Sequence, residues 1–460
     1  MSADTVSVTG WGRTAPTAAR PIRLRSYGEA VAAVRDRGAR GGIPRGLGRA
    51  CGDAAQNAGG AVFDMTALNR VHAIDAEGGT VLCDAGVSLH RLMEVLLPLG
   101  WFVPVTPGTG YVTVGGAIGA DVHGRNHHVS GSFSRHVLCF ELLTADGAIR
   151  TVRCGTPLFD ATTGGMGLTG MILTATVQMQ PVETSLMSVD TERTRDLDDL
   201  MVRLTTGDRG YRYSVAWIDL LARGAATGRA VLTRGDHASL ETAGQLGAAG
   251  PLAGGTRARR DPPAFRPPRF PGPPAFLPEG LVNRTTVGLF NELWYRKAPR
   301  ARTGRLQRIS AFFHPLDGVP HWNRVYGRGG FVRYQFVVGH GQEEALRRIV
   351  RRVSGQRCPS FLAVLKRFGD ADPGWLSFPA PGWTLALDVP AGLPGLGALL
   401  DELDEVVAAA GGRVCLAEDS RLRPELLAAM YPHLDDFRAL RAQLDPRGVF
   451  ASDLSRRLAL

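Results

Sequence analysis

Three short glycine-rich segments in the first 170 residues constrain the fold of this chain more than any other feature. They are IPRGLGRACGD (43–53), PVTPGTGYVTVGGAIGADVHGRNHH (104–128) and TTGGMGLTG (162–170). Glycine can adopt positive φ and has no Cβ, so such loops bring backbone N–H groups close to a phosphate. One loop alone would be weak support, because ordinary turns also use glycine. Three in one region predict a cradle for a large, phosphate-bearing cofactor.

The common nucleotide motifs do not match these loops. No Gly-Lys-Ser/Thr follows the first loop, which excludes a P-loop, and no third glycine opens a clear helix, which excludes the dinucleotide fingerprint. His123, His127 and His128 end the second loop. His123 and His127 are four residues apart, a spacing that can bind a metal only when both lie on one helix. The adjacent Gly124 and the absence of a carboxylate partner both argue against a metal site. We therefore expect no metal.

Bulk composition indicates a soluble globular protein with more than one core. The chain has 460 residues, with 44% hydrophobic and 21% charged residues, which favours two domains. No apolar run is long enough to span a membrane and the N-terminus lacks a secretory signal, so the default location is cytoplasmic. The six cysteines are scattered and form no C-x-x-C pair, which argues against a zinc site and a disulfide framework.

The formal net charge of +10 predicts attraction to an anion, such as nucleic acid, a membrane face or a phosphorylated substrate. Arginine enrichment from GC-rich coding would explain part of this charge. No basic recognition helix or aromatic–basic stripe supports nucleic-acid binding, so we expect no nucleic-acid partner.

Local patterns predict an α+β fold. Strands are expected at 61–65, 80–86, 171–179, 211–221, 330–339 and 383–390, and helices at 26–38, 88–100, 342–353 and 396–412. We expect a first domain over 1–180 and a second domain over 181–410 with a large, mostly antiparallel sheet. Residues 411–460 would form a C-terminal segment that returns to the first domain. The Pro/Arg-rich stretch 251–280 would be either a mobile lid or an inert surface loop.

The motifs in their order resemble a known family. RGLGRACGD, DMTALN (64–69), TVGGAI (113–118), DVHGRNHH (121–128), ELWYRK (292–297), FHPLD (313–317) and RYQF (333–336) are similar to those of FAD-binding oxidoreductases of the vanillyl-alcohol-oxidase type. Within that family the chain looks most like the decaprenylphosphoryl-ribose oxidases, the flavin subunits of an epimerase for cell-wall arabinan precursors.

The resemblance implies a PCMH-type FAD domain, a substrate domain and oxidation of a secondary alcohol on a sugar or polyprenyl-phosphoryl sugar, with hydride passing to flavin N5. The alternatives are a related sugar-alcohol or aldonolactone oxidase, or a flavin-binding paralogue without catalysis. The family also implies a lipid-linked or small-molecule substrate, a reductase partner that completes an epimerisation, and peripheral membrane or cell-envelope association.

The resemblance assigns site residues by position. FAD would be held by Arg45, Gly46, Leu47, Gly48, Arg49, Ala50, Cys51, Gly108, Thr113, Val114, Gly115, Gly116, Ala120, Val122, His123, Gly167, Ile172 and Cys415. The substrate would face Trp217, Phe313, Gln335, Lys366, Thr384 and Ala386, with His123, Lys366 and Glu418 as the catalytic candidates. Lys366 could fix a phosphate or, if desolvated, act as a base. Glu418 could be a base if burial raises its pKa, and the alternative for both is an ordinary solvated charge.

Departures from the family concentrate at the substrate wall. Glu418 stands where the family has a lysine, and Cys415 and Cys51 stand where it has aromatic residues. Thr384 and Ala386 replace the family's Asn and Cys. Covalent relatives carry a histidine where this chain has Arg49, so the flavin is expected to bind without a covalent bond.

Overall fold

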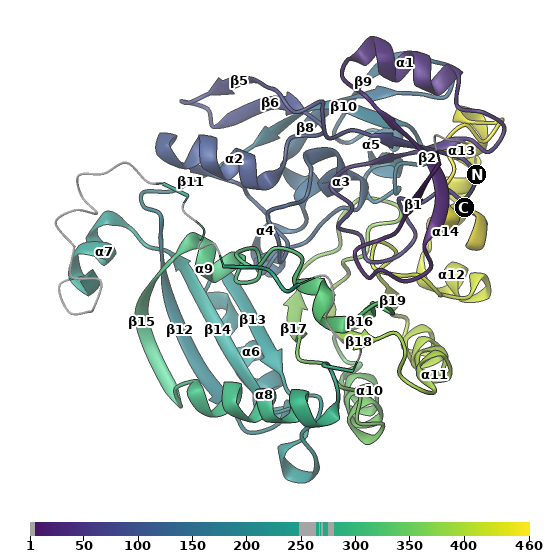
Figure 1. Ribbon diagram of the computed structural model, residues 1–460. Helices are drawn as coiled ribbons and strands as arrows, with labels where there is room; N and C mark the ends of the chain where they lie inside the picture. The colour runs from purple at the N-terminus through teal and green to yellow at the C-terminus, as the bar shows by residue number, and fades with distance from the viewer. Residues whose placement is uncertain (1–4, 248–263, 266, 268–269, 275–279) are drawn as a thin grey trace.

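The computed structural model describes residues 5–247, 264–265, 267, 270–274 and 280–460 (Figure 1). Its N-terminal part carries two sheets, and a larger sheet lies below them in the view of Figure 1. Most of the Pro/Arg-rich stretch 251–280, and with it the lid hypothesis, lies outside the described residues.

The first sheet has four strands in the order β1-β2-β4-β3, namely β1 (Val6–Val8), β2 (Thr17–Arg23), β4 (Ala61–Asp64) and β3 (Gly42–Arg45). Both β2 and β3 run parallel to β4, a pairing that the sequence patterns did not predict. Helix α1 (Tyr27–Arg35) connects β2 to β3. Ser26 caps this helix by accepting a hydrogen bond from the N–H of Glu29, as its position predicts.

The second sheet is antiparallel, with strands β5 (Val71–Asp75), β6 (Thr80–Asp84), β10 (Met171–Gln178), β8 (Val137–Leu143) and β9 (Ile149–Arg153) in that order. Helix α2 (Leu89–Leu96) begins after the predicted cap Ser88, and Gly100 takes the left-handed conformation just beyond it. The shorter elements here are α3 (Val114–Gly119), α4 (His127–Ser130), α5 (Pro157–Thr162), β7 (Trp101–Phe102) and β11 (Gln180–Pro181).

The third sheet has eight antiparallel strands. Their order is β15 (Ala301–Arg308), β12 (Leu186–Thr194), β14 (Ala230–His237), β13 (Tyr213–Ile218), β17 (Ala363–Phe368), β18 (Gly382–Pro390), β16 (Phe331–Gly339) and β19 (Arg413–Val414). This sheet confirms the predicted α+β fold with a large antiparallel sheet.

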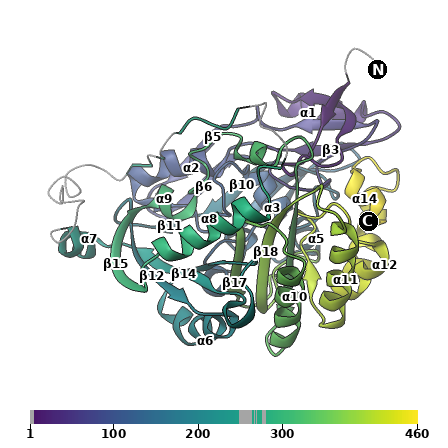
Figure 2. The same ribbon diagram turned by 60° about the horizontal axis from the view of Figure 1, so that its bottom comes forward.

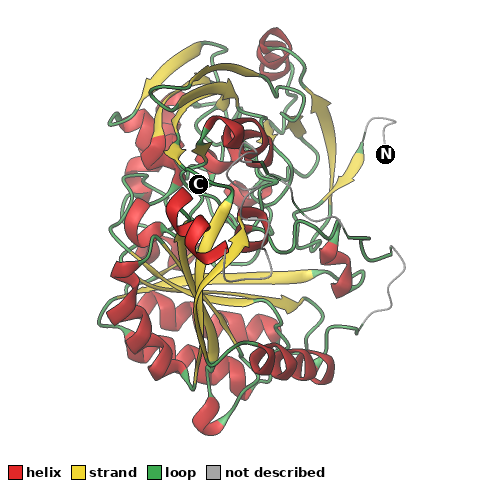
Figure 3. Cartoon of the chain, turned by 90° about the vertical axis from the view of Figure 1, so that its left-hand side faces the viewer, coloured by secondary structure: helices red, strands yellow, loops and turns green. Residues whose placement is uncertain are grey.

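Helices cover one face of the large sheet. They are α6 (Leu197–Gly207), α10 (Glu343–Gly355) and α11 (Leu396–Ala409), and their buried leucine, isoleucine and valine side chains form one core with Leu365, Leu385 and Phe336 of the sheet. Figure 3 shows the strands between this helical layer and the N-terminal part of the chain. The opposite face of the sheet is therefore turned toward the glycine-rich loops.

The remaining helices are α7 (Leu240–Gly247), α8 (Arg284–Lys297), α9 (Ile309–Phe313), α12 (Pro424–Met430), α13 (Leu434–Leu444) and α14 (Asp453–Arg457). The C-terminal segment contacts the first sheet: Phe450 forms a parallel bridge with Gly42, and Arg457 pairs with Asp53 at 2.8 Å. The division into domains at residues 180 and 410 remains our proposal.

Candidate active site

The first glycine-rich loop follows β3 and exposes a run of backbone donors. The N–H groups of residues 46 to 51 have no acceptor within the described part of the protein. The side chain of Arg45 stabilises this loop, because its guanidinium donates hydrogen bonds to the carbonyls of Ala55 (2.9 Å) and Thr9 (2.6 Å). Gly48 has φ +65°, a conformation that favours glycine. Consecutive free N–H groups form an anion-binding concavity.

Arg49 adds a positive charge to this concavity. Its guanidinium carbon lies 3.9 Å from the ring centre of Trp11 and 5.4 Å from that of Tyr111. The Nε of Arg49 is buried and has no acceptor among the described residues. A cation held between two rings with an unused donor suits a negatively charged ligand.

The second and third loops close against the first. A Cβ on Gly46 would lie 2.2 Å from Oγ1 of Thr113, so these two loops touch. Thr113 caps α3 by accepting from the N–H of Gly116 at 3.2 Å. In the third loop, Gly164 donates to Ile118 of α3, and a Cβ on Gly167 would lie 2.9 Å from Cγ of Pro44 in β3. Three loops far apart in the chain thus converge on one place.

The remaining cofactor candidates lie around these loops. Gly108 is exposed with open space on its Cβ side, and Ala120 and Val122 follow α3 toward the large sheet. Ile172 is buried in β10, among the apolar side chains of the second sheet. The free N–H run, the orphaned Arg49 Nε and the glycine contacts fit a dinucleotide such as FAD, whose pyrophosphate would lie against residues 46–51.

Strand register builds the opposite wall of the site from the large sheet. Trp217, Val364, Ala386 and Gln335 are cross-strand neighbours in one row over β13, β17, β18 and β16. Lys366 and Thr384 pair in the adjacent row. Since side chains alternate along a strand, all of these residues share the face turned toward the loops. The register thus brings together five of the six substrate candidates.

His123 joins the cradle to this wall. Gln335 Nε2 donates to His123 Nε2 at 2.9 Å and also contacts Oγ1 of Thr384 at 3.2 Å. Phe368 and Phe378 pack on the imidazole, with ring centres 4.8 and 5.5 Å away. Burial, then the charges of Lys366 and His127, lower the pKa of His123 well below its usual value. The imidazole is therefore neutral, and its Nε2 accepts the bond from Gln335.

Lys366 is the titratable cation of the wall. Desolvation, followed by the nearby charge of Arg125, lowers the pKa of Lys366 to about 7. Arg125 itself lies over the ring of Phe312 at 4.9 Å, and burial lowers its pKa to about 10. At neutral pH Arg125 stays charged, while a large share of Lys366 is a free amine that can accept a proton.

Glu418 belongs to a buried charge cluster beside the wall. Arg333 makes a bidentate pair with Asp388, with distances of 2.6 and 2.8 Å, and its Nη1 lies 3.6 Å from Oε1 of Glu418. The other oxygen of Glu418 is buried without a donor among the described residues. Burial, then the Glu418 carboxylate, raise the pKa of the Cys51 thiol, while Cys415 donates its N–H to the carbonyl of Gln335.

Three charged members of this site were not singled out from the sequence. Arg125, Arg333 and Asp388 stand within the quoted motifs DVHGRNHH and RYQF and in strand β18. No local pattern separates them from ordinary surface charges. Because side chains alternate along a strand, Arg333 lies on the same face as Gln335, and this alternation could have identified Arg333 as a site residue.

Phe313 lies apart from the polar wall. It is 1% exposed and packs on Tyr213 and Phe102, with ring centres 4.8 and 5.3 Å away. It contributes to the core beneath the second loop, so any effect on a substrate would pass through its neighbours.

The three histidines of the second loop have three separate partners. His127 contacts Asp372 at 2.8 Å, and His128 contacts the carbonyl of Tyr211 at 2.9 Å, while His123 contacts Gln335. Within the described residues, no group of three or more His, Cys, Asp or Glu side chains is arranged to hold a metal ion.

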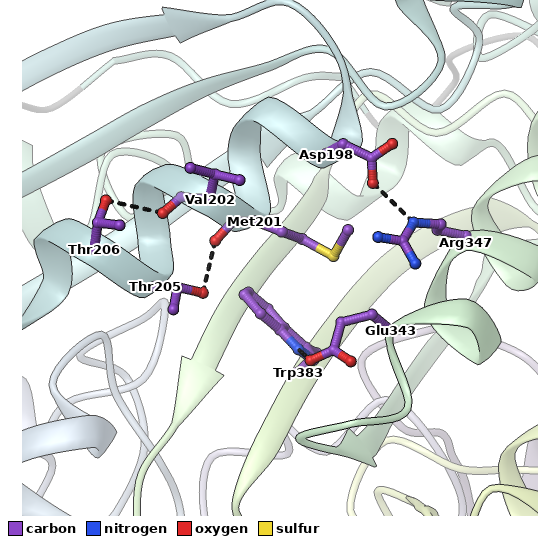
Figure 4. A pocket seen from close by; sticks show the side chains of 8 residues that line it. All are labelled: Asp198, Met201, Val202, Thr205, Thr206, Glu343, Arg347 and Trp383. Carbon is purple, nitrogen blue, oxygen red and sulfur yellow. Dashed lines mark hydrogen bonds and ion pairs between the residues drawn. The ribbon is translucent and has the colours of Figure 1, made fainter.

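A separate pocket of about 320 Å³ lies on the helix-covered face of the large sheet (Figure 4). Its walls include Met201 of α6, Arg347 of α10 and Trp383 of β18. Trp383 points away from Thr384 because successive strand residues face opposite sides. This pocket is therefore not part of the site. In the described part of the chain, no helix is both long and apolar enough to cross a bilayer.

Comparisons with known proteins agree with this geometry. Residues 20–153 match the FAD binding domain family, and residues 340–458 match the D-arabinono-1,4-lactone oxidase family. The solved structure of Physcomitrella patens BBE-like 1 superposes with a TM-score of 0.65 at 13% identity, covering 97% of this chain and 96% of that one. The two family matches and the cradle together define an FAD-dependent oxidoreductase.

Full-length relatives identify the family. The chain is 45% identical to decaprenylphosphoryl-beta-D-ribose oxidase of Mycolicibacterium smegmatis, over 99% of this chain and 98% of that protein. It is 57% identical to an uncharacterized Streptomyces coelicolor protein from the mprA 5′ region, over 81% of this chain and all of that protein. The protein belongs to the decaprenylphosphoryl-β-D-ribose oxidase family of FAD-binding oxidoreductases.

Proposed function

We propose that this protein oxidises a secondary alcohol on a polyprenyl-phosphoryl sugar. The observation that carries the proposal is the position of Lys366 on the sheet wall, opposite the cofactor cradle. Gln335 of the same wall bonds to His123, which follows the second loop. The relative from Mycolicibacterium smegmatis is named for the same substrate class. FAD, when bound, supplies the acceptor for the hydride that leaves the carbinol carbon.

Lys366 would take the proton of the reacting hydroxyl. Its pKa of about 7 leaves a free amine available near neutral pH. Loss of the hydroxyl proton to Nζ and of hydride to the cofactor would turn the alcohol into a ketone and leave the cofactor reduced. Gln335 fixes neutral His123 beside the same space, so the two side chains can orient the sugar hydroxyls.

Cations on this side of the molecule would hold the substrate phosphate. Arg125 lies next to Lys366, and the guanidinium of Arg333 reaches the same face of the sheet. Arg333 is already paired with Asp388 and Glu418, whereas Arg125 has no ion pair among the described residues. We therefore assign phosphate contact to Arg125 first.

The ketone product would need a second enzyme. A separate nicotinamide-dependent reductase that returns hydride to the opposite face of the carbonyl would complete an epimerisation. This partner is part of the proposal and rests on the resemblance to the flavin subunits of an epimerase.

A second candidate is oxidation of an uncharged sugar alcohol or aldonolactone. Glu418 favours it, because a carboxylate beside Arg333 reduces the positive potential that an anionic substrate would meet. Anaerobic mixing of the holoenzyme with a farnesyl-phosphoryl-ribose analogue, an alditol and an aldonolactone separates the two. The proposal expects the flavin colour to bleach with the phosphoryl sugar, and bleaching only by the uncharged compounds would overturn it.

A further inference from the structure

Helix α8 (Arg284–Lys297) is attached to the protein through polar contacts and turns apolar side chains outward. Asn291 is fully buried and donates to Asp219 at 2.7 Å, and Tyr295 donates to the carbonyl of Thr194 at 3.0 Å. On the outer side Leu289 is 62% exposed and Leu293 is 59% exposed. Figure 2 shows α8 running across the strands of the large sheet, on the side opposite α6.

Two aromatic residues extend this outer face. Phe290 and Trp294 are 41% and 45% exposed, and their rings stack with centres 5.9 Å apart. We call Leu289, Phe290, Leu293 and Trp294 the α8 patch. An amphipathic helix normally buries its apolar stripe, so a contiguous exposed stripe marks an interaction surface.

Positive charge surrounds the α8 patch. Exposed cations at the two ends of the helix and in the segment after it are Arg284, Lys297, Arg300 and Arg302. The acidic residue of the helix, Glu292, is neutralised by pairing with Arg229 and Arg296. Leucine and tryptophan inside a rim of arginine and lysine are complementary to an anionic lipid surface.

A line of aromatic rings leads inward from the α8 patch. Phe290 packs edge-on against Phe361 (5.9 Å), and Tyr326 stacks on Phe361 (5.7 Å) and on Phe331 (4.7 Å). The guanidinium of Arg333 lies 5.9 Å from the Phe331 ring centre, next to Glu418. Tyr326 and Phe331 are buried, so these rings form a packed core between the exposed patch and the charge cluster of the site.

We propose that the α8 patch docks the enzyme on an anionic lipid bilayer. The docking surface does not rest on the proposed function. The patch and the site lie on the same side of the large sheet, so a docked enzyme turns the face that carries the site toward the membrane.

Vesicle sedimentation tests the docking surface on the holoenzyme. Vesicles of phosphatidylcholine with about 30% phosphatidylglycerol should bind the wild type, and vesicles of phosphatidylcholine alone should bind it much less. Leu289→Asp/Leu293→Asp should weaken binding at least about tenfold, because it places charges at the apolar contact. Val202→Asp is the matched control, since Val202 is 61% exposed on α6 at the opposite face of the sheet.

Turnover separates docking from the proposed chemistry. The double variant should lose at least about tenfold in turnover of a long-chain substrate held in vesicles, and should keep wild-type turnover of a short-chain, water-soluble analogue. If the wild-type enzyme turns over neither compound, the proposed function is overturned. The vesicle binding result then decides docking by itself. Equal vesicle binding by the wild type and the double variant would overturn docking. So would a wild type that binds no vesicles and instead forms a dimer that the double variant loses.

Discussion

The side-chain amide of Gln335, on the large sheet, donates a hydrogen bond to His123, which follows the second glycine-rich loop, over 2.9 Å. These residues are 212 positions apart in the chain. The bond fixes which nitrogen of the neutral imidazole carries its proton, because Nε2 must accept. This contact joins the cofactor side to the substrate side of the site, together with the contacts of His127 with Asp372 and of His128 with Tyr211.

Gln335→Met should keep FAD bound and reduce turnover. Methionine has a similar length but leaves the buried Nε2 of His123 without its donor, at a cost of about 1 to 3 kcal/mol. We expect kcat/KM to fall about tenfold or more, with an unchanged ratio of flavin to protein absorbance. Full activity in this variant would show that His123 needs no partner on the sheet.

Lys366→Met should abolish the fall in kcat/KM that we expect on the acidic side of the pH profile. In the wild type, kcat/KM should rise with pH through about 7, because protonated Lys366 cannot accept the substrate proton. The methionine variant should lose about 10²- to 10⁴-fold in rate. Lys366→Arg is the control, since it keeps the charge but cannot act as a base near neutral pH. Recovery of the rate by arginine would assign Lys366 to phosphate binding instead.

Glu418→Gln should move the same fall in kcat/KM to lower pH. The Glu418 carboxylate favours the ammonium form of Lys366 and so raises its pKa, in opposition to burial and Arg125. Removing that negative charge lowers the pKa, and the free amine then persists in more acidic solution. If Glu418 is itself the base, the substitution should eliminate turnover. An unchanged profile would make Glu418 a bystander.

Gly108→Val should impair flavin binding without harming the fold. Nothing in the described protein lies within 4 Å of a Cβ built on Gly108, so the new side chain would meet only the cofactor. We expect a low flavin content together with an unchanged Tm of the apoprotein. Gly115→Val provides the contrast, because its Cβ would lie 2.9 Å from Cβ of Ala85 and should lower the Tm even without flavin. Stoichiometric flavin in Gly108→Val would remove this residue from the cradle.

Acid precipitation of the purified protein should release all of its flavin into the supernatant. Arg49, held between Trp11 and Tyr111, cannot form the bond that a histidine makes to flavin in covalent relatives. Absorbance and fluorescence of the two fractions measure the outcome. Flavin that stays with the pellet would point to a covalent link elsewhere in the chain.

Local sequence determined the elements and the cofactor class. Ser26 and Ser88 begin helices where predicted, and Gly100 takes the left-handed conformation just beyond α2, because caps and left-handed glycines act within a few residues of their own position. The three glycine-rich loops predicted a phosphate-bearing cofactor for a similar reason, since the absence of a Cβ is a property of each residue alone.

Only the tertiary structure decided the chemistry of the wall and the outer face of α8. Lys366, Gln335 and Glu418 lie on different segments, and their contacts depend on strand order and register, which no local pattern specifies. Likewise, α8 turns Leu289 and Leu293 outward, because Asn291 on its other side is buried and bonds to Asp219. Periodicity defines the faces of an element, whereas its partners in space decide which face is covered.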